Sequence, residues 1–431
     1  MSAPASGHYA FVESNTTGTG RLAVERLLRR GCTVTFLARQ PEKYPFLESP
    51  RPGLDVAVVE TNELHTVMAR LGEIHRRQPI DVVLTFSEYY IPTVAEVAAR
   101  FAFRYLDPAV ARRCRNKHQT RRALAAAGLP TPVSHAVSSF AEALAVSRQM
   151  TYPCIVKPPE ESSSAGVRQV GDAAALLAHF EVLHGWRENA RGQRMDGVVL
   201  VESLLDGPEV SVETVTLAAG ETRIVGITQK HLSPPPLFVE LGHDFPAELA
   251  PRQTAEIERA TRAALDAVGY DFGPAHTELR LTHRGPVVVE INPRLAGGMI
   301  PELVLHATGI DLLEALLDQL AGKAIDLEPK RRDFAAIRFL TAPRAGLWTA
   351  VHGIDEARGL PSVQEVSLNK KLGMPVRPAE EATGRLGQVI TAGGDRRQVL
   401  TEVEAAIGRL RVEVAPPVEI STPAVVSEIS P

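Results

Sequence analysis

Short apolar stretches alternate with amphipathic ones along the first hundred residues. Four stretches rich in β-branched residues have the length and composition of buried strands: 8–13, 33–38, 56–59 and 82–86. Apolar residues at helical spacing predict two helices between these strands, one over residues 21–30 and one carrying Leu64, Met68 and Leu71. This alternation predicts a parallel, doubly wound, Rossmann-like α/β domain over residues 1–111.

The pattern changes after residue 112. A helix rich in Arg and Ala is predicted over 116–128, because Gly128 and two prolines end it. Strands are predicted at four places, the last three of them as one antiparallel block: 154–157, 198–202, 209–217 and 223–229. Residues 233–240 hold three prolines and predict a loop, and residues 255–268 predict an amphipathic helix.

A hairpin is predicted where strands 275–281 and 286–291 flank a short turn, and a helix is predicted over 308–320. The remaining strands, 335–341 and 387–392, and a helix over 397–410 predict a small C-terminal α+β unit. We therefore expect four parts: 1–111, a central domain 112–325 divided into 112–202 and 203–325, the unit 326–413, and a disordered tail 414–431 rich in Pro, Ser and Val.

Composition narrows the class of protein without identifying it. The chain has 431 residues, a formal charge of −4 and three cysteines, Cys32, Cys114 and Cys154. The charge predicts neither nucleic-acid nor membrane partners, and neither a secretory signal nor a long apolar span is evident. Widely spaced cysteines predict buried free thiols in a reducing compartment, so we expect a cytoplasmic protein with small-molecule partners and leave a homodimer open.

The strongest chemical signal lies on the predicted hairpin, where Glu278 precedes Glu290, Asn292 and Arg294. Residues i and i+2 share a face of a strand, so Glu290, Asn292 and Arg294 point the same way, and Glu278 can face them from the partner strand. Such oxygen ligands suit Mg²⁺, and Arg294 could bind a phosphoryl group. The alternative is a hairpin with solvated charges, although acids are unusual in so apolar a stretch.

Two lysines are candidate phosphate ligands. Lys157 ends an apolar strand, and the small-residue loop after it, which includes Ser163, Ser164 and Gly166, offers backbone N–H groups. Lys117 begins the Arg-rich helix. Taken alone, each lysine is more often a surface residue, but the acidic hairpin favours phosphate binding.

A third segment could hold a nucleoside. The strand ending at Glu202, Ser203 and Leu204 could pair with an adenine edge, Glu202 accepting from the amino group, and Glu209 could hold ribose hydroxyls. These are also ordinary residues for an edge strand, and their spacing alone does not decide between the two interpretations.

Taken together, these motifs resemble the ATP-grasp superfamily in order and rough spacing over residues 100–325. The chain is most similar to carboxylate–amine ligases of the L-amino acid ligase (dipeptide synthetase) branch, which belong to natural-product pathways. The resemblance implies an ATP-grasp fold after a Rossmann-like domain. It also implies residue roles: ATP at Lys117, Lys157, Ser163, Ser164, Gly166, Glu202, Ser203, Leu204, Glu209, Glu278 and Glu290; metal at Glu278, Glu290 and Asn292; catalysis by Lys157 and Arg294; substrate at Glu240, His243, Arg294, Gly297 and Gly298.

The resemblance implies an enzyme that uses ATP and Mg²⁺, with Mn²⁺ as an alternative, to activate a carboxylate as an acyl phosphate and join it to an amine. One feature departs from the family: the loop 162–166 is rich in serine and has a single glycine. Two other activities are weighed against this one. An ATP-grasp carboxylase would act on bicarbonate, and Gly18-x-Gly20-x-x-Ala23 after a strand could mark an NADP-binding oxidoreductase.

Overall fold

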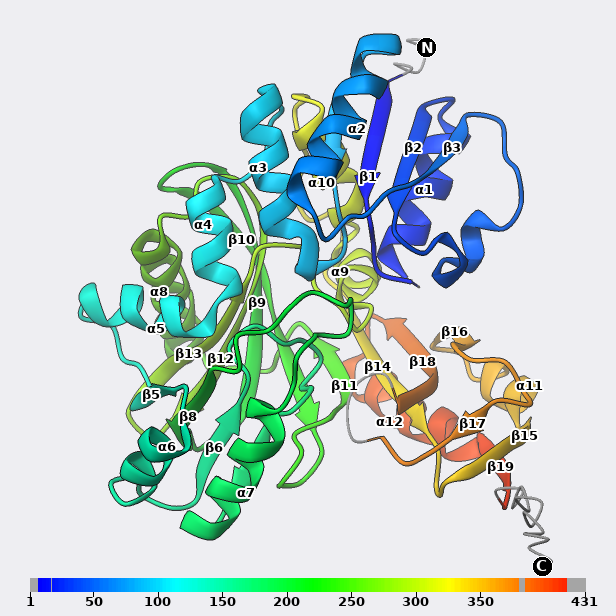
Figure 1. Ribbon diagram of the computed structural model, residues 1–431. Coiled ribbons are helices and arrows are strands. Elements are labelled where there is room, and N and C mark those ends of the chain that lie inside the picture. Colours follow the sequence, from blue (N-terminus) through cyan, green and yellow to red (C-terminus); the bar gives the residue numbers. More distant parts are fainter. Residues whose placement is uncertain (1–6, 17, 380–383, 417–431) are drawn as a thin grey trace, which may run out of the picture.

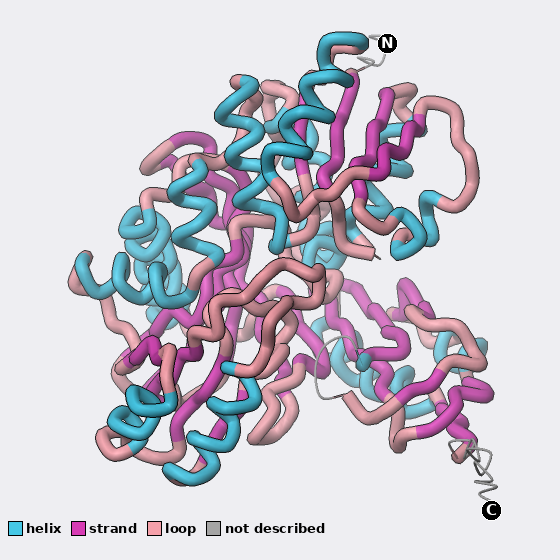
Figure 2. Tube along the Cα trace, viewed as in Figure 1, coloured by secondary structure: helices cyan, strands magenta, loops and turns pink. Residues whose placement is uncertain are grey.

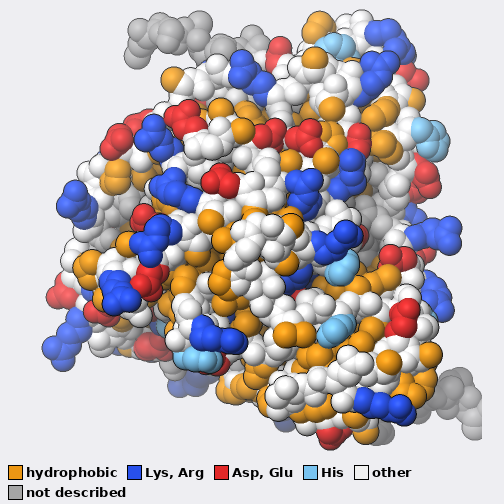
Figure 3. All heavy atoms as spheres, turned by 90° about the vertical axis from the view of Figure 1, so that its left-hand side faces the viewer, with side chains coloured by type: hydrophobic (Ala, Val, Ile, Leu, Met, Phe, Trp, Pro, Cys, Tyr) orange, Lys and Arg blue, Asp and Glu red, His pale blue; other side chains and the backbone are white. Residues whose placement is uncertain are grey.

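The computed structural model describes residues 7–16, 18–379 and 384–416. Within them the chain forms four β-sheets with helices on their faces (Figure 1). None of the described helices combines the length and the apolar character needed to cross a membrane. On the face shown in Figure 3, acidic and basic side chains are interspersed.

The N-terminal sheet confirms the predicted α/β arrangement. Its four strands are parallel and lie in the order β3-β2-β1-β4. The elements are β1 (His8–Val12), α1 (Thr19–Arg29), β2 (Thr33–Ala38), β3 (Leu54–Val58), α2 (Leu64–Arg77), β4 (Val82–Leu84) and α3 (Ile91–Phe101), with short 3-10 turns η1 (Pro41–Lys43), η2 (Pro45–Leu47) and η3 (Glu88–Tyr90). The turn η3 follows the carboxyl end of β4, the edge at which open α/β sheets bind ligands.

Two helices and a small antiparallel sheet follow. The sheet has the order β5-β8-β6-β7, and α6 and α7 contact it. The elements are α4 (Pro108–Arg115), α5 (Lys117–Ala126), β5 (Ser134–Val137), α6 (Phe140–Ser147), β6 (Cys154–Lys157), β7 (Arg168–Val170), α7 (Ala173–His184) and β8 (Val199–Ser203). The predicted block of three strands was wrong in one respect: β8 pairs with β5 and β6 and belongs to this sheet, apart from the two strands after it.

An eight-stranded sheet forms the centre of the molecule. Its order is β13-β12-β9-β10-β11-β14-β18-β16. The elements are β9 (Glu209–Ala218), β10 (Glu221–Leu232), β11 (Glu240–Phe245), α8 (Pro251–Val268), β12 (Gly273–Thr282), β13 (Gly285–Asn292), α9 (Ile300–Thr308), α10 (Leu312–Leu320), β14 (Phe334–Thr341), β16 (Val363–Leu368) and β18 (Arg385–Gly393). The strand β11 was missed, because the proline-rich loop before it hides its short pattern.

The single helix predicted over 308–320 is two helices. Gly309 ends α9 with a positive φ of 78°, a backbone conformation that favours glycine. Asp311 then caps α10, because its side chain accepts a hydrogen bond from the backbone N–H of Glu314. The apolar periodicity continues across this break, which is why the sequence pattern predicted one helix.

The C-terminal part is less separate than the sequence suggested. Its strands β14, β18 and β16 extend the central sheet, and β11 pairs with β14 (Figure 2). A smaller sheet, β17-β15-β19, completes this part with β15 (Gly346–His352), α11 (Ile354–Arg358), β17 (Pro375–Val376), α12 (Arg396–Arg409) and β19 (Arg411–Ala415). The tail predicted from residue 414 begins too early, because β19 includes Val414, and most of it lies outside the described residues.

One apolar core joins the N-terminal sheet, helix α9 and the central sheet. Phe11 and Phe36 of the N-terminal sheet, Leu303 of α9, and Ile337 and Ile390 of the central sheet belong to the same buried cluster. The helix α9 packs on β11, β14 and β18 of the central sheet, and the shared cluster holds the N-terminal part to it by burial of apolar area.

We expect Leu303→Ala to lower the free energy of unfolding by about 2–5 kcal/mol, because it opens a cavity in this shared core. Urea denaturation measures the change. Val58→Ala is the matched control, since Val58 is 74% exposed on the edge strand β3, and it should cost less than about 0.5 kcal/mol. Equal effects of the two substitutions would contradict the assignment.

Candidate functional site

A cavity of about 220 Å³ lies where the N-terminal turn η3, helix α5, the small sheet and the central sheet meet. Most of the predicted site residues line it: Lys117, Lys157, Ser163, Ser164, Glu202, Ser203, Leu204, Glu209, Glu240, Glu278, Glu290, Asn292, Arg294, Gly297 and Gly298. Gly166 and His243 lie outside its lining. Apart from these two, the structure brings the candidates from the sequence together around one cavity, and the role of each residue stays a prediction.

The acidic hairpin has the register that the sequence analysis required. Glu278 of β12 lies directly opposite Glu290 of β13, and His276 lies opposite Asn292. Cross-strand partners are separated by about 5 Å at Cβ, so the two carboxylates share one face of the sheet. A bulge follows Glu278 and shifts the register beyond it. The hairpin thus presents two carboxylates and one amide at the cavity.

Lys117 lies against this hairpin. It begins α5, whose N-cap Asn116 accepts a hydrogen bond from the backbone N–H of Gln119. Its Nζ is 2.7 Å from Oε1 of Glu290 and donates to the carbonyl of Glu161 at 2.9 Å. The predicted phosphate ligand and the predicted metal ligand are therefore ion-paired with each other.

Lys157 is held by Glu202 in the same way. Its Nζ is 2.6 Å from Oε2 of Glu202, whose other oxygen accepts from Nε of Arg121 at 2.9 Å and from the hydroxyl of Ser134 at 3.0 Å. Burial alone would raise the pKa of Glu202, but Arg121 and Lys157 lower it well below its ordinary value. These partners contact both carboxylate oxygens of Glu202, and its contact with adenine stays a prediction.

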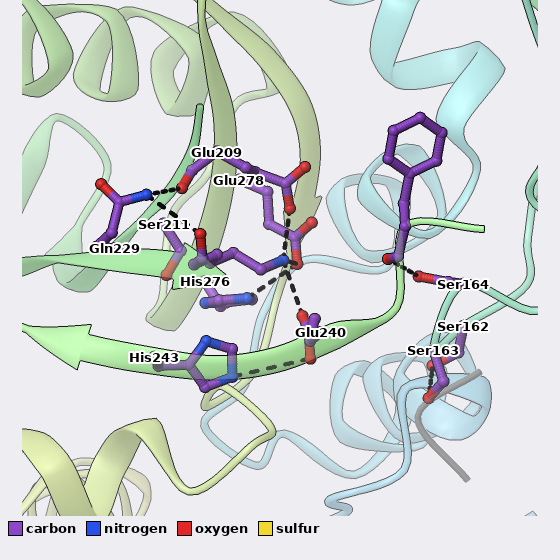
Figure 4. A network of polar contacts seen from close by, with 12 residues as sticks. Ser162, Ser163, Ser164, Glu209, Ser211, Gln229, Glu240, His243, His276 and Glu278 are labelled. Atoms are coloured by element: carbon purple, nitrogen blue, oxygen red, sulfur yellow. Dashed lines mark hydrogen bonds and ion pairs between the residues drawn. The ribbon is translucent and has the colours of Figure 1, made fainter. Parts of the chain in front are cut away.

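A buried lysine from β10, Lys230, contacts three acids, Glu209, Glu240 and Glu278, which are labelled close together in Figure 4. Lys230 Nζ lies 2.7 Å from Glu209, 2.8 Å from Glu240 and 2.9 Å from Glu278. Burial alone would lower the pKa of Lys230, but the three carboxylates raise it well above its ordinary value. Sequence reasoning missed this residue, because the predicted strand ended at residue 229. Glu209, which the sequence predicted to bind ribose, is thus also ion-paired, with Lys230 at 2.7 Å and with Arg280 at 3.0 Å.

A buried histidine, His276, bridges Glu278 and a further acid, Glu213. His276 Nδ1 lies 2.9 Å from Oε1 of Glu213, and its Nε2 lies 3.0 Å from Oε1 of Glu278. Burial alone would lower the pKa of His276, but Glu213 and Glu278 raise it to about 10. The ring is therefore protonated at neutral pH and can donate to both carboxylates.

Arg294 reaches the N-terminal domain. Its Nη2 and Nε lie 2.7 Å and 3.2 Å from one oxygen of Glu88, which belongs to η3. Burial alone would raise the pKa of Glu88, but Arg294 and then Arg115 lower it. Glu88 was missed by sequence reasoning, although its place just after a predicted strand of an α/β domain is a usable signal.

The serine-rich loop closes one side of the cavity. Ser163 and Ser164 adopt positive φ angles of 57° and 61°, and Gly166 has a φ of 71°. The hydroxyl of Tyr89 in η3 donates to Oε2 of Glu161 at 2.7 Å, which ties the start of the loop to the N-terminal domain. The carbonyl of Phe238 accepts a hydrogen bond from Ser164 Oγ at 3.4 Å, and Figure 4 labels the three serines of the loop. Phosphate binding by this loop stays a prediction.

His243 is fully buried beside the cavity. Neither ring nitrogen has a hydrogen-bond partner, and burial lowers its pKa to about 3, so the ring is neutral. A Cβ at Gly298 would lie 2.5 Å from Nε2 of His243, so only glycine fits at this close approach. The ring of His243 packs against Gly298. Its predicted role in substrate binding stays a prediction.

Magnesium and nucleotide phosphates fit this donor set. No group of three or more His, Cys, Asp or Glu side chains is arranged for a metal ion within the described part of the chain. The hairpin instead offers Glu278, Glu290 and Asn292, and Mg²⁺ is commonly bound by one or two carboxylates together with substrate phosphates. Lys117, Lys157 and Arg294 supply the positive charge that such phosphates need.

Comparison with known proteins places the chain in a family. Residues 150–302 match the ATP-grasp domain, and residues 338–415 match the L-amino acid ligase C-terminal domain 2. An uncharacterized protein, y4rH, of Sinorhizobium fredii is 31% identical over 93% of this chain and 82% of its own length. Alanine–anticapsin ligase of Bacillus amyloliquefaciens is 26% identical over 58% of this chain, and the match spans just over half of that protein, 56%.

Solved structures agree on the fold. An L-amino acid ligase from Bacillus licheniformis superposes with a TM-score of 0.81 at 24% identity, over 95% of this chain and 99% of that one. A biotin carboxylase domain from Hydrogenobacter thermophilus, in complex with MgADP and bicarbonate, has a TM-score of 0.69 at 14% identity, over 94% and 90% of the two chains. The sequence prediction of an ATP-grasp fold is confirmed. The chain belongs to the ATP-grasp family of carboxylate–amine ligases.

Proposed function

We propose that the protein joins the carboxylate of an amino acid, or of a similar small acid, to an amine through an acyl phosphate. The observation that carries this proposal is the cavity-facing hairpin, where Glu278 and Glu290 lie opposite each other with Lys117 and Arg294 beside them. The products are an amide, ADP and phosphate. Relatives named as amino-acid ligases support amino acids as the substrate class.

Each charged group has a place in this chemistry. Mg²⁺ would be held by Glu278, Glu290 and Asn292 and, when bound, would neutralise charge on the phosphates; Mn²⁺ has similar ligand preferences. Lys117 and Lys157 orient the terminal phosphates of ATP, and Arg294 binds the transferred phosphoryl group. The substrate carboxylate oxygen attacks the γ-phosphorus, and the bond to ADP breaks.

The second step makes the amide. The amine attacks the acyl carbon, the C–N bond forms, and the C–O bond to phosphate breaks as the nitrogen loses a proton. Water would hydrolyse the acyl phosphate, so it must be excluded. The loop 162–166 and the loop 233–239 before β11 lie beside the cavity and are suited to cover it, because Ser164 Oγ donates a hydrogen bond to the carbonyl of Phe238.

A carboxylase acting on bicarbonate is the second candidate, since structures of that class share the fold. The match of residues 338–415 to the L-amino acid ligase C-terminal domain favours the ligase. An NADP-dependent oxidoreductase has weaker support. In such a protein Arg39, which directly follows β2, would be the side chain near the 2′-phosphate, but it pairs with Glu60 at 3.1 Å.

Transfer of a carboxylate oxygen to the released phosphate tests whether an acyl phosphate forms. Amino acids are first screened singly and in pairs for ADP release, with bicarbonate as a separate trial. With the active acid labelled by ¹⁸O in its carboxylate, we expect one label in the released phosphate for each turnover. Unlabelled phosphate, or release of AMP and pyrophosphate, would exclude the proposed chemistry.

Glu290→Gln should lower ADP formation by on the order of 100-fold or more, because it removes a charged ligand at the site of phosphoryl transfer. Steady-state assays at several Mg²⁺ concentrations measure the loss. Glu221→Gln on the exposed start of β10 is the control and should keep normal turnover. Near-normal turnover of Glu290→Gln with an unchanged Mg²⁺ requirement would remove Glu290 from the metal site.

Lys157→Met should weaken ATP binding by about 1.5–3 kcal/mol, the scale of a charge-assisted hydrogen bond. The fold should tolerate the change, since Glu202 keeps Arg121 and Ser134 as partners. Calorimetric titration with ATP gives the dissociation constant, and Lys323→Met, at a partly exposed ion pair, is the control. Equal affinity of wild type and Lys157→Met would make Lys157 a purely structural partner of Glu202.

A further inference from the structure

Lys230 is the one group shared by three carboxylates in the described cavity. Its side chain is 2% exposed, and its ammonium contacts Glu209, Glu240 and Glu278. These acids come from β9, β11 and β12, and the strand order β12-β9-β10-β11 brings them onto one face around β10. The arrangement therefore depends on long-range strand pairing and has no local motif.

Each of the three acids also has a cation of its own. Arg280 lies 3.0 Å from Glu209, Arg385 lies 2.7 Å from Glu240, and His276 lies 3.0 Å from Glu278. Arg280, Arg385 and His276 each contact one of these three acids, whereas Lys230 contacts all three. A shift of Lys230 toward one acid weakens its contact with the other two.

We propose that Lys230 is a positioning residue that couples the nucleotide site to the substrate pocket. The inference rests on the proposed function, together with the expectation from the sequence that Glu209 and Glu278 serve ATP and its metal while Glu240 serves the substrate. A divalent cation at Glu278 repels the ammonium, which then binds Glu240 and Glu209 more strongly. In the reverse direction, loss of the Glu240 contact leaves Lys230 free to compete with the metal for Glu278, because coupling between sites is reciprocal.

The coupling is measurable without knowing the amino-acid substrate. Calorimetry with Mg²⁺ and adenylyl imidodiphosphate, a non-hydrolysable ATP analogue, gives the dissociation constant of the nucleotide complex. Glu240→Gln should raise this constant by about fivefold in the wild-type background, the lower end of typical coupling. In a Lys230→Met background the same change should alter it by less than about twofold, which completes a double-mutant cycle.

A through-space effect of the charge at position 240 would persist after Lys230 is replaced, so the cycle separates the two causes. If Lys230→Met lowers the melting temperature, Lys230→Gln, which keeps hydrogen-bond donors, serves as the second background. Glu221→Gln and Lys323→Met, both at solvent-exposed ion pairs, should leave the dissociation constant unchanged in every background.

The outcomes are distinct. An effect of Glu240→Gln that vanishes without Lys230 supports the coupling. An equal effect in both backgrounds, or no effect in either, overturns it while leaving nucleotide binding intact. If the wild-type protein fails to bind the analogue with Mg²⁺, the proposed function itself is wrong, and the coupling is excluded with it.

Discussion

The cost of burying charge governs the structure of this cavity. Seven acidic side chains, seven Lys or Arg side chains and His276 line it in the described structure, and several are almost wholly removed from solvent: Glu88, Glu161, Glu202, Glu209, Glu240, Glu278, Glu290, Lys117, Arg121, Lys157, Lys230, Arg280, Arg294 and Arg385. An unpaired buried charge costs several kcal/mol, whereas a well-bonded pair approximately offsets its own desolvation. The sheets must therefore bring acids and bases together in matched positions, and this constraint fixes how they meet.

The pairing also prepares the site for its ligands. Lys117, expected to bind phosphate, is paired with Glu290, expected to bind metal, at 2.7 Å. A magnesium nucleotide carries both complementary charges, so it can replace one internal ion pair by two contacts of the same signs. Arg294 and Glu88 form a similar ion pair between the end of the hairpin and the N-terminal domain. Preorganised charges of this kind need little rearrangement when charge develops during phosphoryl transfer.

Local sequence patterns predicted part of this arrangement. The two-residue period of a strand puts Glu290 and Asn292 on one face, so these two could be placed before the structure, whereas Glu278 lies opposite Glu290 because a bulge shifts the register between Glu278 and Leu279. Arg121 and Arg385 could not, because their partners Glu202 and Glu240 lie 81 and 145 residues away in sequence, and Lys230 was missed because the predicted strand ended one residue before it. For the same reason the sequence left Glu202 and Glu209 free, whereas each has two cationic partners. The break at Gly309 was missed because apolar periodicity continues through it.

The C-terminal part contributes to the cavity directly, which follows from sheet topology. The strand β14 pairs with β11, and β18 pairs with β14, so the start of β18 brings Arg385 to the carboxylate of Glu240. Arg385 also lies 3.8 Å over the ring of Phe339, which limits its movement. A separate domain joined by a linker could not hold a side chain so firmly at the cavity. The continuous sheet thus brings Arg385 of β18 into the lining of the cavity, beside the hairpin.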